Sequence, residues 1–72
     1  MTYDYAKLRG RIVERLGSQS QFAKALGVSD RTISLKMRNR VAWRQDEIAK
    51  AARVLGIPRE SILDYFFAEK VQ

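Results

Sequence analysis

The 72-residue sequence contains no cysteine and no histidine. The lack of cysteine excludes a disulfide bond and a thiolate nucleophile, and the lack of histidine removes the usual imidazole base and the commonest zinc ligand. No carboxylate pair stands in an apolar setting, and no glycine-rich phosphate loop is present. We therefore expect neither an enzyme nor a bound metal or cofactor. A composition without cysteine also fits a cytoplasmic protein.

Long apolar runs and turn-forming residues are scarce as well. No run approaches the roughly 20 apolar residues that a membrane-spanning helix needs, and the opening MTYDYAKLRGRIV does not resemble a signal peptide. One proline and four glycines leave little room for long loops, and no alternating strand pattern is sustained. We predict one all-α domain over residues 1–72. Its last residues, 68–72, form a tail that could be coil, a turn or a short strand.

Positive charge is what the sequence has in excess. Fourteen lysines and arginines stand against eight acidic residues, which gives a net charge of +6. Five of the cations, and no acid, fall within residues 31–45. Such a distribution favours a polyanionic partner, with nucleic acid before an anionic membrane surface, over a basic surface that is merely solvated. The membrane alternative is weak, because the apolar positions are needed for a core.

Helical periodicity divides the chain into five short helices. In the first, Val13 widens an apolar stripe, while three cations repeat on another face. In the last, Leu63 belongs to the predicted packing face. Ser18 and Ser29 precede the second and third helices as caps. The predicted helices span residues 5–16, 19–26, 30–38, 45–55 and 59–66.

The second and third helices are joined as a helix-turn-helix in FAKALGVSDRTISLKMRN. Gly27 allows a tight turn, and Ala23 is small where the two helices would cross. Ser29 caps the third helix, so that its positive N-terminal end and its polar side chains face outward. A helix presented in this way fits the major groove of duplex DNA.

The stretch SQSQFAKALGVSDRTISLKMRN resembles the helix-turn-helix core of the phage repressor and Cro family of transcription regulators. The stretch WRQDEIAKAARVLGIPRESILDYF resembles that family's fourth and fifth helices, so the likeness covers about residues 5–67. It implies a compact, five-helix, lambda-repressor-like DNA-binding domain with the helix-turn-helix at its second and third helices. Residues 30–38 would read a double-stranded operator in the major groove. The resemblance also implies a small phage regulator that works in the cytoplasm of a bacterial host.

The resemblance further implies which side chains would contact DNA. Asp30 could accept from a cytosine amine, orient Arg31 or only cap the helix, and Leu35 could meet a thymine methyl group or simply pack. The residues expected to read bases are Asp30, Arg31, Ser34 and Leu35. The residues expected along the phosphate backbone are Gln19, Ser29, Lys36, Arg38, Asn39 and Arg40. Cations of the first helix that could lie in solvent or on phosphate are Lys7, Arg11 and Arg15.

A different class of function stays open beside DNA binding. The same fold could act as an anti-repressor, a protein-interaction module that binds a repressor partner through an exposed Leu35 and the aromatic C-terminus. Residues 65–67 are rich in aromatic side chains, and part of them could instead form a weak homodimer or a dimer assembled on DNA. We place Trp43 in the core.

Overall fold

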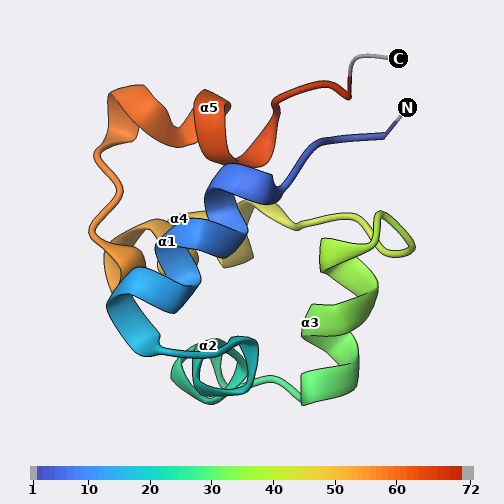
Figure 1. Cartoon of the computed structure of the whole chain (residues 1–72), viewed down its shortest axis with the longest axis vertical. Helices are drawn as coiled ribbons and strands as arrows, with labels where there is room; N and C mark the ends of the chain where they lie inside the picture. The colour runs from blue at the N-terminus through green and yellow to red at the C-terminus, as the bar shows by residue number, and fades with distance from the viewer. Residues whose placement is uncertain (1, 71–72) are drawn as a thin grey trace.

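Five α-helices and one short 3-10 helix make up the fold in the computed structural model, which describes residues 2–70. The Cα radius of gyration is 11.2 Å, close to the value of about 11 Å expected for a compact chain of this length. The predicted compact all-α fold with five helices is therefore confirmed. The elements shown in Figure 1 are α1 (Ala6–Leu16), α2 (Gln19–Leu26), α3 (Asp30–Met37), α4 (Gln45–Leu55), η1 (Arg59–Ser61) and α5 (Ile62–Phe66).

The helix limits follow the predicted caps. The hydroxyl of Ser18 accepts a hydrogen bond of 3.2 Å from the amide of Gln21, and that of Ser29 accepts one of 3.1 Å from the amide of Thr32. Gly27 closes α2 with a φ of +76°. This left-handed conformation strains any residue that carries a β-carbon, so the turn between α2 and α3 requires glycine.

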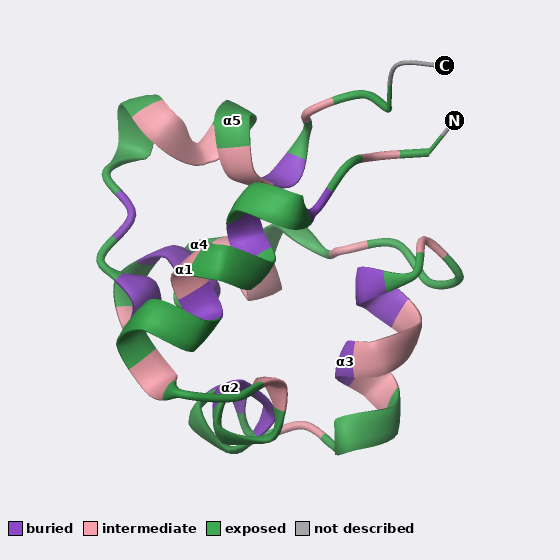
Figure 2. Ribbon diagram, viewed as in Figure 1, coloured by how far each residue is buried: buried purple, intermediate pink, exposed green. Residues whose placement is uncertain are grey.

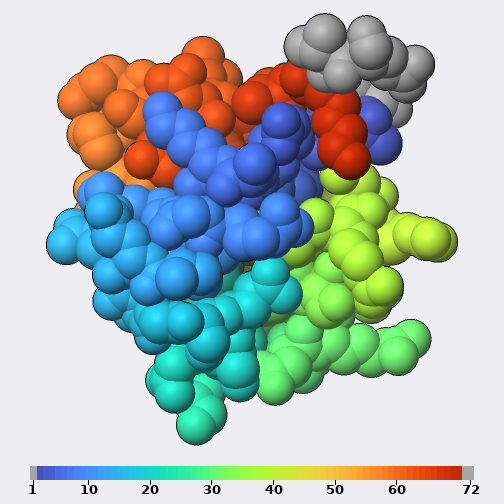
Figure 3. Space-filling model, viewed as in Figure 1, coloured from blue at the N-terminus to red at the C-terminus, as the bar shows by residue number. Residues whose placement is uncertain are grey.

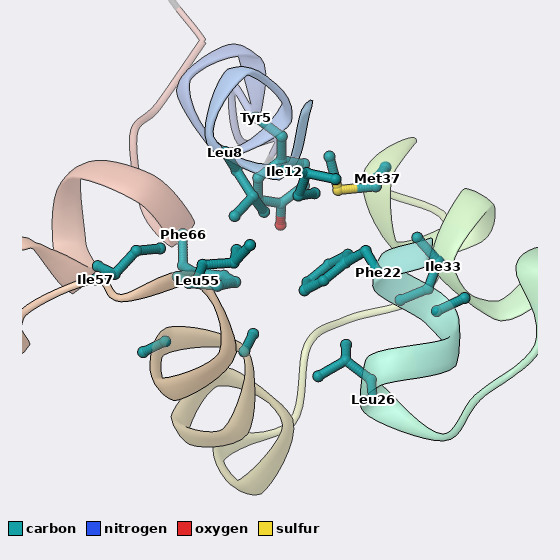
Figure 4. Packing of buried hydrophobic residues seen from close by; sticks show 13 residues of the cluster. Tyr5, Leu8, Ile12, Phe22, Leu26, Ile33, Met37, Leu55, Ile57 and Phe66 are labelled. Carbon is teal, nitrogen blue, oxygen red and sulfur yellow. The ribbon is translucent and has the colours of Figure 1, made fainter. Parts of the chain in front are cut away.

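The core lies between the helices, and α3 closes one side of it by packing its inner face against α2. Figure 4 shows Phe22 of α2 and Ile33 of α3 approaching the core from one side, while Leu55 and Phe66 approach from the opposite side. Trp43 is half-buried, as predicted for a residue of the core. Its ring centroid lies 5.3 Å from that of Phe66 in an edge-to-face arrangement. The largest fully buried side chains are Phe22, Phe66, Leu8, Ile12, Ile33 and Leu55.

Two apolar residues that we placed in the packing stripes are exposed instead. Val13 is 56% exposed, because Ile12 occupies the contact with the core and the next residue points about 100° further round the helix. Leu63 is 69% exposed, because the five-residue α5 buries Phe66 and leaves Leu63 on its outer side. Apolar periodicity therefore located the helices, but it included one exposed residue in the buried face of α1 and one in that of α5.

The cationic face of α1 contacts the protein itself. Arg11 donates from Nε to the carbonyl of Leu55 and from Nη2 to that of Gly56, both at 2.8 Å, and Arg15 Nε donates to Leu55 at 3.0 Å. These carbonyls end α4, where the helix leaves acceptors unpaired and its dipole is negative. Lys7 lies 4.8 Å from the ring centroid of Tyr65. The two arginines thus serve as caps for α4.

The predicted tail pairs with the other end of the chain. Tyr3 and Glu69 form an isolated antiparallel bridge, and the amide of Asp4 donates to the carbonyl of Ala68 at 2.6 Å. The tail is therefore extended at residue 69, while residues 71 and 72 lie outside the described part. Within residues 2–70, no helix has the length and apolar character that crossing a membrane requires.

Candidate functional site: helix α3 and the loop that follows it

Helix α3 and the loop over residues 38–44 form one edge of the molecule (Figure 1). Ile33 and Met37 are buried and fix the inner side of α3 against the core. The opposite side and the first turn face solvent, as the green N-terminal end of α3 in Figure 2 shows. Arg31 is exposed there, and Leu35 is half-buried rather than fully exposed.

The first residue of α3, Asp30, has a carboxylate that is hydrogen-bonded within the chain. The hydroxyl of Ser20 on α2 lies 3.1 and 3.2 Å from its two carboxylate oxygens. A negative charge at this end stabilises the helix dipole. Of the three roles left open for Asp30, the geometry supports a helix-end role that also ties α3 to α2.

Lys36 does not point outward, contrary to the prediction that it would lie along a DNA backbone. Its side chain is buried, and Nζ donates to Oε1 of Glu47 at 2.7 Å and to the carbonyl of Ala42 at 2.9 Å. The ammonium also lies 5.6 Å from the ring centroid of Trp43. Its position on α3 faces the start of α4, so its positive charge is paired inside the fold and is not free to contact DNA. Among the described residues, it is the one charged side chain that is buried.

Glu47 connects α3, the loop and α4. It accepts from Lys36 and, at 2.8 Å, from the backbone amide of Arg44 at the start of α4. Burial raises the pKa of Glu47. The hydrogen bonds from Lys36 and Arg44, with the attraction of the ammonium, outweigh that burial and the repulsion by Asp46, so the net pKa lies below 4.5. Glu47 is therefore ionised at neutral pH and pairs with the buried lysine.

Asn39 is also used within the chain. Its φ is +63°, a conformation that asparagine tolerates better than most residues. Its side-chain amide donates to the carbonyl of Tyr3 and accepts from the amide of Tyr3, both at 2.9 Å. The end of α3 is therefore clamped to the N-terminal segment, 36 residues away in sequence.

The outer edge thus holds fewer free polar groups than the sequence suggests. The predicted site residues that are exposed are Ser29, Asp30, Arg31, Arg38 and Arg40, and those that are half-buried are Gln19, Ser34, Leu35 and Asn39. The hydroxyl of Ser29 is taken up by the cap and by a 2.9 Å contact with the hydroxyl of Thr32. The assignment of single residues to bases or phosphates stays a prediction. Glu47 was missed, because nothing local marks its pairing with a lysine eleven residues earlier.

A family model described as "Protein of unknown function (DUF739)" matches residues 1–69. The chain belongs to the DUF739 family. It is also similar to a solved structure, the modulator of repression (MOR) of the temperate bacteriophage TP901-1 from Lactococcus lactis. That likeness covers 100% of this chain and 97% of the MOR chain, with 49% sequence identity and a TM-score of 0.84. No curated protein sequence matches this chain.

These comparisons correct the main functional prediction. We expected a sequence-specific DNA-binding regulator as in the phage repressor and Cro family, and that expectation is wrong. The family that matches is DUF739, and the similar structure is a modulator of repression, which favours the alternative of a protein that acts on a repressor. One contact in the structure agrees with this correction, because Lys36, which we expected along the phosphate backbone, is buried and paired with Glu47. The broader prediction of a small phage regulator agrees with the phage relative.

Proposed function

We propose that this chain is an anti-repressor, a small phage protein that modulates repression by binding a repressor protein. The observation that carries this proposal is the end-to-end likeness to a phage modulator of repression at 49% identity. We further propose that the chain keeps the helix-turn-helix framework of the phage repressor and Cro family and uses it to contact protein. It would work as one binding domain without catalysis or a cofactor.

The outer edge of α3 and its loop has the composition of a protein contact. Leu35 is half-buried on α3, and Val41 in the loop is 43% exposed. Asp30 and Arg31 at the start of the helix supply charges of both signs. Apolar groups inside a polar rim are typical of protein interfaces.

The same edge is held in shape before any partner arrives. The Lys36–Glu47 ion pair fixes α3 to α4, and the clamp of Asn39 on Tyr3 fixes the end of the helix. Because a surface ordered in advance loses little entropy on binding, a short edge can still bind a partner tightly.

Calorimetry with the full-length repressor encoded by the same phage tests this proposal. At about 150 mM salt, where exposed charges are well screened, we expect a saturable complex with the repressor and little heat with an operator duplex. Leu35→Glu should weaken the complex, while Lys24→Glu, on an exposed position of α2, should not. Tight binding to the duplex without any binding to the repressor would refute the proposal.

A further inference from the structure

A groove of about 260 Å³ lies where the two ends of the chain meet the α3–α4 loop. Its walls include Tyr3 from the N-terminal segment, Val41 and Trp43 from the loop, Ile48 from α4 and Phe67 after α5. Figure 3 shows the dark blue N-terminal segment, the yellow-green loop and the red C-terminal segment side by side. We call this site the terminal groove.

The walls of the terminal groove include apolar side chains that stay exposed to solvent. Val41 is 43% and Phe67 41% exposed, although the ring of Phe67 meets that of Tyr3 edge-to-face with centroids 5.7 Å apart. Val41 and Phe67 both line the groove, so their exposed surfaces face the same cavity. Contiguous exposed apolar surface on a small protein marks an interaction site.

A cationic pocket adjoins the terminal groove. This second cavity, of about 370 Å³, shares Tyr3, Tyr5 and Asn39 with the groove. Three exposed cations line it: Arg9, Arg38 and Lys70. Asp4 also lines it, but its carboxylate accepts from the amide of Ala6 at 2.9 Å. The pocket therefore has an excess of positive charge directly beside an apolar surface.

We propose that the terminal groove binds a segment of the repressor that carries both apolar and acidic side chains. The apolar side chains of that segment would lie between Val41 and Phe67. One of its carboxylates would lie among Arg9, Arg38 and Lys70. This inference rests on the proposed function and adds the segment of the partner that is bound. Charge complementarity favours an acidic protein over a second copy of this chain, because the net charge of +6 makes two copies repel. A nucleic acid would use the cations but leave the apolar walls uncovered.

Hydrogen bonds within the chain form the terminal groove in advance. The clamp of Asn39 on Tyr3, the Tyr3–Glu69 bridge and the bond from the Asp4 amide to Ala68 hold its walls together. A segment that docks there meets fixed walls, so its apolar and acidic groups must be spaced to match them.

Two exposed positions test the inference with matched controls. Val41→Asp places a like charge where an acidic segment would bind, and Lys70→Glu reverses a charge of the cationic pocket. The controls Val13→Asp and Lys24→Glu make the same changes at exposed positions that line neither cavity. Each variant is titrated calorimetrically into full-length repressor, after circular dichroism has shown that it is folded.

We expect each groove variant to weaken repressor binding by roughly tenfold or more, as loss of an interface anchor does, and the controls to stay within about twofold. Lys70→Glu should also reduce the dependence of affinity on salt. If the parent binds the repressor and the groove variants bind equally well, the groove inference is overturned while the proposed function stands. If the parent does not bind the repressor, the proposed function itself fails. A parent dimer in sedimentation that only Val41→Asp dissociates would assign the groove to a second copy and also overturn the inference.

Discussion

The ion pair between Lys36 and Glu47 should make the two partners unequal in their importance for stability. The lysine is buried, whereas the glutamate keeps 21% of its side chain exposed, and the two lie 2.7 Å apart. Glu47→Ala would leave a buried ammonium with only the carbonyl of Ala42 and the face of Trp43. Lys36→Met would instead leave a partly exposed carboxylate that still accepts from Arg44.

The size of the difference follows from that geometry. Stranding a buried charge costs about 3–5 kcal/mol, and the partial exposure of this pair places Glu47→Ala near 3 kcal/mol. The lost acceptor for the amide of Arg44 adds about 1 kcal/mol. Lys36→Met keeps an unbranched apolar stem against Trp43 and should cost about 1 kcal/mol for the donor lost to Ala42. A domain of this size has about 4–11 kcal/mol of total stability, so Glu47→Ala should be close to unfolding.

Urea unfolding at neutral pH measures both variants through the fluorescence of the single tryptophan, Trp43. We expect a free-energy loss about 3 kcal/mol larger for Glu47→Ala than for Lys36→Met. The double variant Lys36→Met/Glu47→Leu serves as control and should recover most of the stability, because no charge is left buried. An equal or larger loss for Lys36→Met would show that the ammonium is not held as the structure places it.

The titration of Glu47, the turn at Gly27 and the clamp of Asn39 can each be tested as well. Because the pKa of folded Glu47 lies below 4.5, its stabilisation should be present above that pH and be lost as the pH falls through the lowered value. Thermal unfolding should therefore show a smaller gap between the parent and Glu47→Gln in acid than at neutral pH, and a constant gap would contradict this. Gly27→Val should cost about 1–3 kcal/mol in urea unfolding, because the φ of +76° strains valine; an unchanged midpoint would refute the turn. Asn39→Ala should cost about 1–3 kcal/mol and speed hydrogen exchange at the Tyr3 amide, whereas unchanged exchange there would exclude the clamp.

The features of the fold that the sequence predicted correctly are those set by interactions between neighbouring residues. Ser18, Ser29 and Gly27 act on neighbouring backbone groups, so their spacing was enough to place the ends of α2 and the start of α3. The same reasoning placed too much of α1 and α5 in the core. Whether Val13 or Leu63 is covered depends on which helix packs opposite, and no local pattern records that.

The site was predicted less well than the fold, because its decisive contacts join distant segments. The sequence predicted Lys36 to be a free cation, but in the structure it pairs with Glu47. It likewise predicted Asn39 to lie along DNA, but its side chain bonds to Tyr3. The terminal groove combines both chain ends with a loop from the middle. The count of five positive charges along residues 31–45 therefore included one, Lys36, that is buried.

Fluorescence anisotropy can test directly whether this chain acts on a repressor. A labelled operator duplex is first bound by the full-length repressor and is then titrated with this chain. Salt is kept at about 150 mM, so that contacts depending on phosphate are weakened rather than exaggerated. We expect the anisotropy to fall toward the value of free DNA as the chain binds the repressor, and the chain alone to leave the free duplex unchanged. A rise in anisotropy when the chain alone binds the duplex, with no effect on the bound repressor, would contradict the proposed anti-repressor function.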